Sequence, residues 1–483
     1  MEKARVNKRL VGFWTVLGTI ALPLPAVALC PADLPAAIDA ISTRPELARA
    51  RLGLQVETLT GDPVYSRGGD RFFVPASTLK LLTTAAVLTQ LGPDYTISTT
   101  VYGITDATEM TTLRVLGQGD PSFGREDLTT LATQLTQQNI REVDILYGDE
   151  SAFPGSAVNP NWEWEDVQAG YGAPVNALIL AENEIGLSLI PQGLGEPLQV
   201  VWDEPTQQSG WRVDNRSTTV PAEDPEFVSV GRDLADPILR VRGQLVAGSE
   251  PERVSIAVPN SGEAFLVAFQ SALALQNISV QQMALSPIPV APDWPELARV
   301  QSPPLAELLI PANQSSNNLY AEALLKQLGR QSGTQEDATQ VSIEIALTIL
   351  RDLGVDPTAV VMVDGSGLAR KNLITPIAMV DVLQAMARSP LADTYRQSLA
   401  VAGVNGTLRN RFRDTPVTGR LWGKSGAISR NFALAGYLEP LNYEPIAFSI
   451  FINNIDQRGS VARGLIDDLV LQLAGLRSCN GES

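Results

Sequence analysis

The feature that most constrains the fold is a long β-like passage set between segments that favour helices. Residues 98–294 contain short runs with strand composition, such as 112–116, 198–202, 238–246 and 254–258, separated by glycine and proline. A proline-rich passage with Pro287, Pro289, Pro292 and Pro295 ends it, and helical patterns resume at Leu305. We therefore predict a domain that is interrupted by a mostly β insertion.

The segments on either side of this passage predict an α+β domain. Residues 52–66 alternate around a Gly-Asp-Pro turn, which indicates a β-hairpin, and a helix is expected from Pro75 to the Gly92-Pro93 stop. Later segments predict helices at 319–328, 340–353, 376–388 and 463–476, and strands at 420–427, 432–438 and 446–453. Short turns join these strands, so we expect an antiparallel sheet covered by helices.

The N-terminus has the pattern of a secretory signal peptide. Cations including Lys3 and Arg5 precede an apolar run at residues 10–22, and Ala26-Val27-Ala28 has the form of a cleavage site. The run is too short for the ~20 residues of a membrane span. We predict cleavage after Ala28, export, and no transmembrane span afterwards.

The expected division is a signal peptide at 1–28, the first part of the catalytic domain at 29–97, the insertion at 98–294, and the second part of the catalytic domain at 295–483. Cys30 and Cys479 lie near the two ends of the mature chain. In an oxidising compartment they could form a disulfide, and two free thiols are an equally good alternative.

Composition restricts the chemistry. The 483 residues include no histidine, which excludes Ser-His-Asp triads and most catalytic zinc sites. The net charge of -17 argues against a nucleic-acid partner, because phosphate binding needs clustered cations. We predict no metal and no cofactor, so acid-base work falls to lysine, carboxylates or tyrosine.

Ser77 and Lys80 form a candidate nucleophile and base. Residues three apart share one face of a helix, so the Lys80 amine can reach the Ser77 hydroxyl. An exposed lysine is protonated at neutral pH, so burial and a second cation, for which Lys424 is a candidate, must lower the pKa by roughly three units. Taken alone, the pair is explained as well by a helix-capping serine and an exposed lysine.

Two further short motifs follow in the sequence. Ser316-Asn317-Asn318 opens a predicted helix and is adequately explained as a cap. Lys424-Ser425-Gly426 lies on a predicted strand and is adequately explained as a strand end. The ordered set Ser-x-x-Lys, Ser-x-Asn and Lys-Ser-Gly, however, resembles the three-motif signature of penicillin-binding proteins and serine β-lactamases.

Flanking blocks make the resemblance more specific. They are Leu-Gly-Gln-Gly-Asp-Pro at 116–121, Tyr-Gly-Ala-Pro at 171–174, Ser-Pro-Pro-Leu at 302–305, Asp-Gly-Ser-Gly-Leu at 364–368 and Gly-Thr-Leu-Arg at 406–409. With the long insertion between the first two motifs, they resemble the D-alanyl-D-alanine carboxypeptidase/endopeptidase family of class C penicillin-binding proteins, peptidase family S13. The resemblance covers nearly all of the mature chain. It implies that the α+β domain is a penicillin-binding-protein/β-lactamase-like transpeptidase domain with a large, mostly β insertion.

The resemblance implies a role for each motif residue. Ser77 would attack the carbonyl between two D-alanines, or that of a D-Ala-diaminopimelate cross-link, and Lys80 would take its proton. Ser316 would relay a proton to the leaving amine, and Asn318 would hold the substrate amide. The catalytic set is completed by Lys424, which with the Ser425 hydroxyl would bind the terminal carboxylate.

The same resemblance implies the substrate-binding residues. Gly426 would permit close backbone approach, and the N–H groups of Ser77 and Ala427 would form the oxyanion hole. The family usually has threonine at position 427, so alanine leaves the balance of carboxypeptidase and endopeptidase action open. Asp166 and Arg370, with Tyr171 beside them, would grip the charged side chain of diaminopimelate, or else be a solvated carboxylate and a surface cation.

The expected function is therefore an exported, periplasmic serine D-Ala-D-Ala carboxypeptidase/D,D-endopeptidase acting on peptidoglycan stem peptides, with β-lactams as covalent inhibitors. Peripheral membrane association is left open. The alternatives are a serine β-lactamase, for which no Glu-x-x-Leu-Asn block is present, and a non-catalytic peptidoglycan-binding protein.

Overall fold

The structure is a computed structural model that describes residues 29–105, 111–204, 208, 210–233, 236–286, 294–333 and 335–479. The predicted signal peptide and Pro287, Pro289 and Pro292 lie outside these residues. Within them, no helix has both the length and the apolar character needed to cross a membrane.

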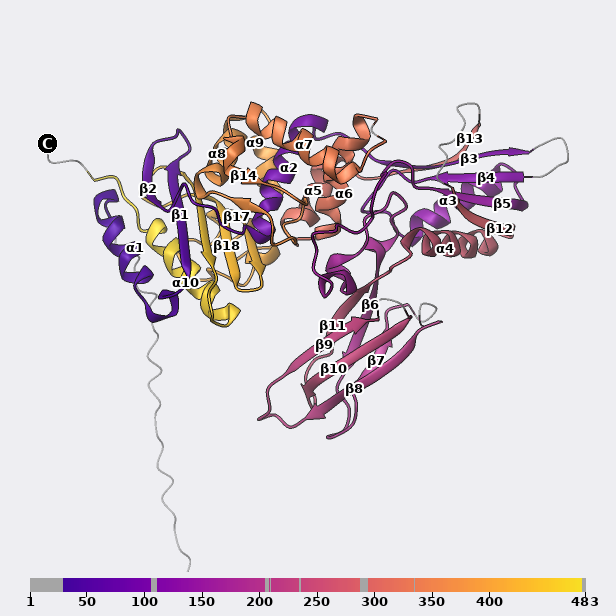
Figure 1. Cartoon of the computed structure of the whole chain (residues 1–483), viewed down its shortest axis with the longest axis horizontal. Coiled ribbons are helices and arrows are strands. Elements are labelled where there is room, and N and C mark those ends of the chain that lie inside the picture. Colours follow the sequence, from indigo (N-terminus) through magenta and orange to yellow (C-terminus); the bar gives the residue numbers. More distant parts are fainter. Residues whose placement is uncertain are drawn as a thin grey trace, which may run out of the picture.

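A six-stranded antiparallel sheet forms the centre of the largest part of the molecule (Figure 1). Its strands, in spatial order, are β16 (Ala400–Val401), β17 (Leu421–Ile428), β18 (Asn431–Leu438), β19 (Ile446–Asn453), β1 (Arg51–Thr58) and β2 (Pro63–Arg67). The predicted hairpin and the predicted late strands are thus neighbours, because β1 pairs with β19. The expected α+β class is confirmed.

Helices cover both faces of this sheet. Along β18, Ala433, Ala435 and Tyr437 face one core, and Leu434 and Leu438 face the other, as the two-residue repeat of a strand requires. The first core is closed by α2 (Lys80–Leu91), α5 (Leu305–Asn313), α6 (Asn318–Gln331), α7 (Ala338–Asp352), α8 (Pro376–Arg388) and α9 (Ala392–Gln397). The second is closed by α1 (Leu34–Ser42) and α10 (Gly459–Ala474).

The segment between α2 and α5 projects from this body (Figure 1). One part is a five-stranded sheet of β12 (Ser279–Ser286), β5 (Glu142–Asp149), β4 (Thr111–Leu116), β3 (Ser98–Thr105) and β13 (Glu296–Gln301), packed against α3 (Arg125–Gln137) and α4 (Ser261–Leu275). The other part has two three-stranded sheets. They are β11 (Glu252–Ala257), β6 (Glu184–Ile190) and β7 (Gln199–Trp202), and β8 (Arg212–Val220), β10 (Ile238–Val246) and β9 (Phe227–Arg232).

Two details refine the expected layout. The strand β13 pairs with β3, so the sheet of the insertion extends past the proposed boundary at residue 295, and we propose a boundary near residue 302 instead. The insertion also contains two helices that were not predicted. In α3 the buried Leu128, Leu131 and Leu135 have helical spacing, but threonine and glutamine surround them.

The two ends of the described chain are joined. Cys30 and Cys479 form a disulfide with Cα atoms 5.7 Å apart. Beside it, the Leu29 N–H donates to the Gly475 carbonyl at 2.8 Å, and the Arg477 N–H donates to the Leu29 carbonyl at 3.0 Å. Of the two alternatives for the cysteines, the structure has the disulfide.

Candidate active site

Ser77 lies on a tight turn at the entrance to α2. Residues Ala76–Leu79 form a 3-10 turn rather than the first turn of the predicted α-helix, and Ala76 has a φ of 48°. This left-handed conformation is strained for a residue with a Cβ, and such strain is concentrated at functional sites. The turn places Ser77 at the wall of a cleft.

The Lys80 amine lies behind Ser77 and has three acceptors. It donates to Ser77 Oγ at 3.1 Å, to Asn318 Oδ1 at 2.7 Å and to the Ser366 carbonyl at 2.7 Å. An ammonium group has three protons to donate, so these contacts satisfy it fully. The Lys80 side chain is fully buried, so the alternative of an exposed lysine is wrong.

The second and third motifs meet at a hydrogen bond between Lys424 and Ser316. The Lys424 amine, also fully buried, donates to Ser316 Oγ at 2.8 Å. The Asn318 amide donates to the Tyr171 carbonyl at 2.8 Å, and the Asn317 amide donates to Glu182 Oε2 at 2.6 Å. The inserted segment therefore holds both asparagines of this motif.

Burial controls the protonation of the two amines. It lowers the pKa of Lys80 to about 7, although the carboxylates of Asp364 and Glu322 act in the opposite direction. Burial, together with the nearby charge of Lys80, lowers the pKa of Lys424 well below its ordinary value. Of the two causes expected from the sequence, burial is thus the main one for the lowered pKa of Lys80, and Lys424 is not among the groups that shift it.

This pKa predicts how acylation of Ser77 depends on pH. Only the neutral amine can accept the Ser77 proton, and a pKa of about 7 means that the neutral fraction rises as pH rises through neutrality. We expect the second-order rate of penicillin acylation to increase with pH and to level off above a midpoint near 7. Stopped-flow rates measured at constant ionic strength would test this, and a profile that is flat across neutrality would contradict it.

The strand β17 passes close to the Ser77 turn. An ideal Cβ built on Gly426 would lie 2.7 Å from the Pro75 carbonyl oxygen and 3.2 Å from the Ser77 nitrogen. Only glycine permits this approach. Ala427 is exposed and lines the same cleft as Ser77, as an oxyanion hole built from their two N–H groups requires.

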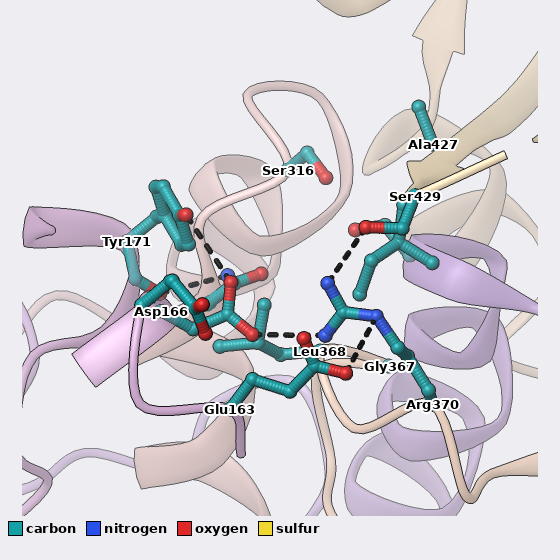
Figure 2. A pocket seen from close by; sticks show the side chains of 13 residues that line it. Glu163, Asp166, Tyr171, Ser316, Gly367, Leu368, Arg370, Ala427 and Ser429 are labelled. Carbon is teal, nitrogen blue, oxygen red and sulfur yellow. Dashed lines mark hydrogen bonds and ion pairs between the residues drawn. The ribbon is translucent and has the colours of Figure 1, made fainter. Parts of the chain in front are cut away.

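The cleft has a volume of about 610 Å³ and a charged end. There the Arg370 guanidinium donates to Asp166 Oδ2 at 3.1 Å and to Ser429 Oγ at 2.7 Å, and it pairs with Glu163 at 3.0 Å. Figure 2 shows Arg370 between the two carboxylates and Ser429. Asp166 is buried and accepts from the Tyr171 hydroxyl at 3.2 Å, so it is not a solvated loop carboxylate.

The predicted residues thus come together, with different exposures. Ser77, Asp166, Tyr171, Ser316, Asn318, Arg370 and Ala427 line the cleft. Lys80, Lys424 and Gly426 lie behind its wall. The Ser425 hydroxyl is hydrogen-bonded to Thr407 Oγ1 at 2.8 Å, which explains why the Gly-Thr-Leu-Arg block lies beside the third motif.

Sequence reasoning missed Glu163, Ser429 and the buried Glu322. A glutamate inside a helix and residues in loops carry no distinctive local pattern. The one usable signal is the four-residue spacing of Asn318, Glu322 and Lys326, which places three polar side chains on one face of α6.

Relatives of this chain have similar length and fold. The D-alanyl-D-alanine carboxypeptidase of Actinomadura sp. (strain R39) is 34% identical over 460 residues, which covers 90% of this chain and 84% of that protein. The penicillin-sensitive carboxypeptidase A of Dictyostelium discoideum is 26% identical and covers 85% and 83%. The crystal structure of penicillin binding protein 4 (dacB) from Haemophilus influenzae shares the fold, with a TM-score of 0.79 at 23% identity and coverage of 90% and 98%.

The fold and the Ser-Lys site together define a serine hydrolase of the penicillin-binding-protein class. The D-Ala-D-Ala carboxypeptidase 3 (S13) family matches residues 34–474. The chain belongs to this family, and the predicted activity class, a serine D-Ala-D-Ala peptidase, is confirmed.

Proposed function

We propose that this enzyme cleaves D-Ala-D-Ala termini and D-Ala-diaminopimelate cross-links of peptidoglycan stem peptides through an acyl-enzyme on Ser77. The observation that carries the proposal is the contact of 3.1 Å between Lys80 Nζ and Ser77 Oγ, made by an amine whose pKa is about 7. An amine with this pKa and this position is a competent general base at neutral pH.

Acylation would follow from the contacts around Ser77. Neutral Lys80 accepts the hydroxyl proton as Ser77 Oγ attacks the D-alanine carbonyl, and the Ser77 and Ala427 N–H groups stabilise the oxyanion. The C–N bond then breaks, and Ser316, hydrogen-bonded to Lys424, relays a proton to the leaving amine. It gives the amine its own hydroxyl proton and takes up the proton held by Lys80, so Lys80 returns to its neutral form. Water hydrolyses the ester and restores Ser77.

Substrate specificity would come from two groups of residues. A terminal carboxylate near Lys424 and Ser425 would raise the lowered pKa of Lys424 and so favour its cationic form. At the charged end of the cleft, Arg370 and Asp166 offer one cation and one anion. The amine and the carboxylate of a diaminopimelate side chain need this pair of charges.

We further propose that the enzyme is exported to the periplasm. The proposal rests on the signal-like N-terminus and on the Cys30–Cys479 disulfide, because disulfides persist in oxidising compartments.

A labelled penicillin and two muropeptides test the proposed reaction. The chain from Leu29 onward should form a long-lived adduct on the Ser77 peptide, located by mass spectrometry, and should cleave pentapeptide or cross-linked stems. Rapid turnover of penicillin without stem cleavage would indicate a β-lactamase instead. Neither adduct nor cleavage would indicate a binding protein, and Ser77→Ala is the matched negative control.

A further inference from the structure

Glu322 is a buried carboxylate one turn beyond Asn318 on α6. It is only 2% exposed. Its oxygens accept the Gly365 N–H, with both distances 3.0 Å, and the Ser366 N–H at 2.7 Å. The side chain therefore holds the backbone of the Asp-Gly-Ser-Gly-Leu block rather than a substrate.

The held peptide is the one that contacts the base. The Ser366 N–H donates to Glu322, and the Ser366 carbonyl oxygen accepts a hydrogen bond from the Lys80 amine at 2.7 Å. The helix α6 thus restrains Lys80 twice, directly through Asn318 Oδ1 and indirectly through Glu322 and Ser366. With these two contacts fixed, the remaining position of the nitrogen points at Ser77 Oγ, and it holds a proton in the cationic amine and the lone pair in the neutral base.

Neighbouring groups keep this loop in place. Asp364 accepts the Gly367 and Ala369 N–H groups at 2.9 and 2.6 Å, and also the Trp162 indole at 3.0 Å. Gly367 has a φ of 79°, and a Cβ there would lie 2.0 Å from the Ala76 carbonyl oxygen. The loop is therefore packed against the turn that carries the nucleophile.

We propose that Glu322 is a positioning residue for the base, and that its carboxylate holds the Ser366 carbonyl where it orients the Lys80 amine toward Ser77. The inference deepens the proposed function and rests on it, because it takes Lys80 as the base. Glu322 acts through the peptide of Ser366 and touches no substrate.

The charges around Lys80 give this role a distinctive signature. The ionisable groups that face Lys80 are Glu322 on α6, Asp364 in the loop and Lys424 on β17. Those that face Glu322 are Asp364, Lys80 and Lys326. Burial and the charge of Asp364 raise the pKa of Glu322, while hydrogen bonds from Ser366 and Gly365 favour its charged form. Where Glu322 is charged, it and Asp364 favour protonated Lys80, so loss of the Glu322 charge should lower the pKa of Lys80.

Glu322→Gln and Glu322→Asp separate position from charge. Glutamine must point an NH₂ donor at a backbone N–H, so we expect penicillin acylation to fall about 10- to 100-fold, the cost of a small misplacement of a catalytic group. Its pH midpoint should move below that of the wild type. Aspartate is one methylene too short but keeps the charge, so the rate should fall while the midpoint moves less.

The matched control is Glu344→Gln, which removes an exposed carboxylate from α7 and should leave rate and midpoint unchanged. If folded Glu322→Gln acylates at the wild-type rate with the wild-type midpoint, the proposal is overturned. A loss explained only by less folded protein, with the active fraction unchanged in rate and midpoint, also overturns it.

A second readout is independent of penicillin. In protein labelled with ¹⁵N-lysine, the Nζ signal that is absent in Lys80→Ala reports the titration of this amine. The midpoint of this Lys80 titration should be lower in Glu322→Gln than in the wild type, and an unchanged midpoint would refute the proposal. If the wild type forms no adduct on Ser77, the proposed function fails, and this titration still decides the link between Glu322 and Lys80.

Discussion

Replacing Lys80 with alanine should reduce penicillin acylation of Ser77 by about 1,000-fold, within the range that general-base catalysis contributes. The amine is the only ionisable group that contacts Ser77 Oγ among the hydrogen bonds of the described residues. Without it, the Ser77 proton has no acceptor, since the chain contains no imidazole. Labelling by a fluorescent penicillin, followed over time, measures the effect.

The variant should remain folded, because it removes a buried cation whose desolvation is costly. A thermal melting temperature close to that of the wild type would show this. Lys371→Ala is a suitable control, since Lys371 is exposed and its amine donates to the Asn161 Oδ1 atom at 2.9 Å, away from Ser77. Undiminished labelling in Lys80→Ala would rule out Lys80 as the base.

The second large effect is expected from Gly426→Ala, which changes no charge. The added methyl group would lie 2.7 Å from the Pro75 carbonyl oxygen, and no side-chain rotation can relieve this contact because the backbone fixes the positions of both atoms. Since β17 is held by β18 and the turn by the core, the two must separate and displace the Ser77 and Ala427 N–H groups. We expect acylation to fall about 100-fold, as when an oxyanion donor is lost.

Gly464→Ala is the control for this substitution. Gly464 is an exposed position in the middle of α10, where an added Cβ meets nothing within 4 Å. Alanine there should raise stability slightly, by about 0.5–1 kcal/mol, and leave acylation unchanged. Wild-type acylation by Gly426→Ala would mean that the close approach of β17 has no part in catalysis.

The sequence predicted those parts of the site that depend on short motifs. Each of two pairs lies within three residues of sequence, namely Ser77 with Lys80 and Ser316 with Asn318. Local geometry therefore brings the members of each pair together. That these pairs meet Lys424 follows from the pairing of β1 with β19 and the packing of α2 and α6 on that sheet, which no local pattern encodes. Only the family resemblance predicted this meeting.

Other features could not be predicted, for identifiable reasons. Ala181, Glu182 and Asn183 all have positive φ, although alanine and glutamate give no sign of it. Tertiary contacts fix this turn, in which Asn183 Nδ2 donates to the Pro174 carbonyl at 2.8 Å. The role of Glu322 depends on its burial, and the local sequence does not predict that a glutamate within a helix is buried.

The inserted segment cannot be removed without loss of contacts that hold the second motif. Its Tyr171 carbonyl and Glu182 carboxylate accept hydrogen bonds from the side-chain amides of Asn318 and Asn317, so an excised version lacking residues 98–301 would lose these two contacts of the second motif. Engineering a minimal enzyme from this chain would require new acceptors for both amides.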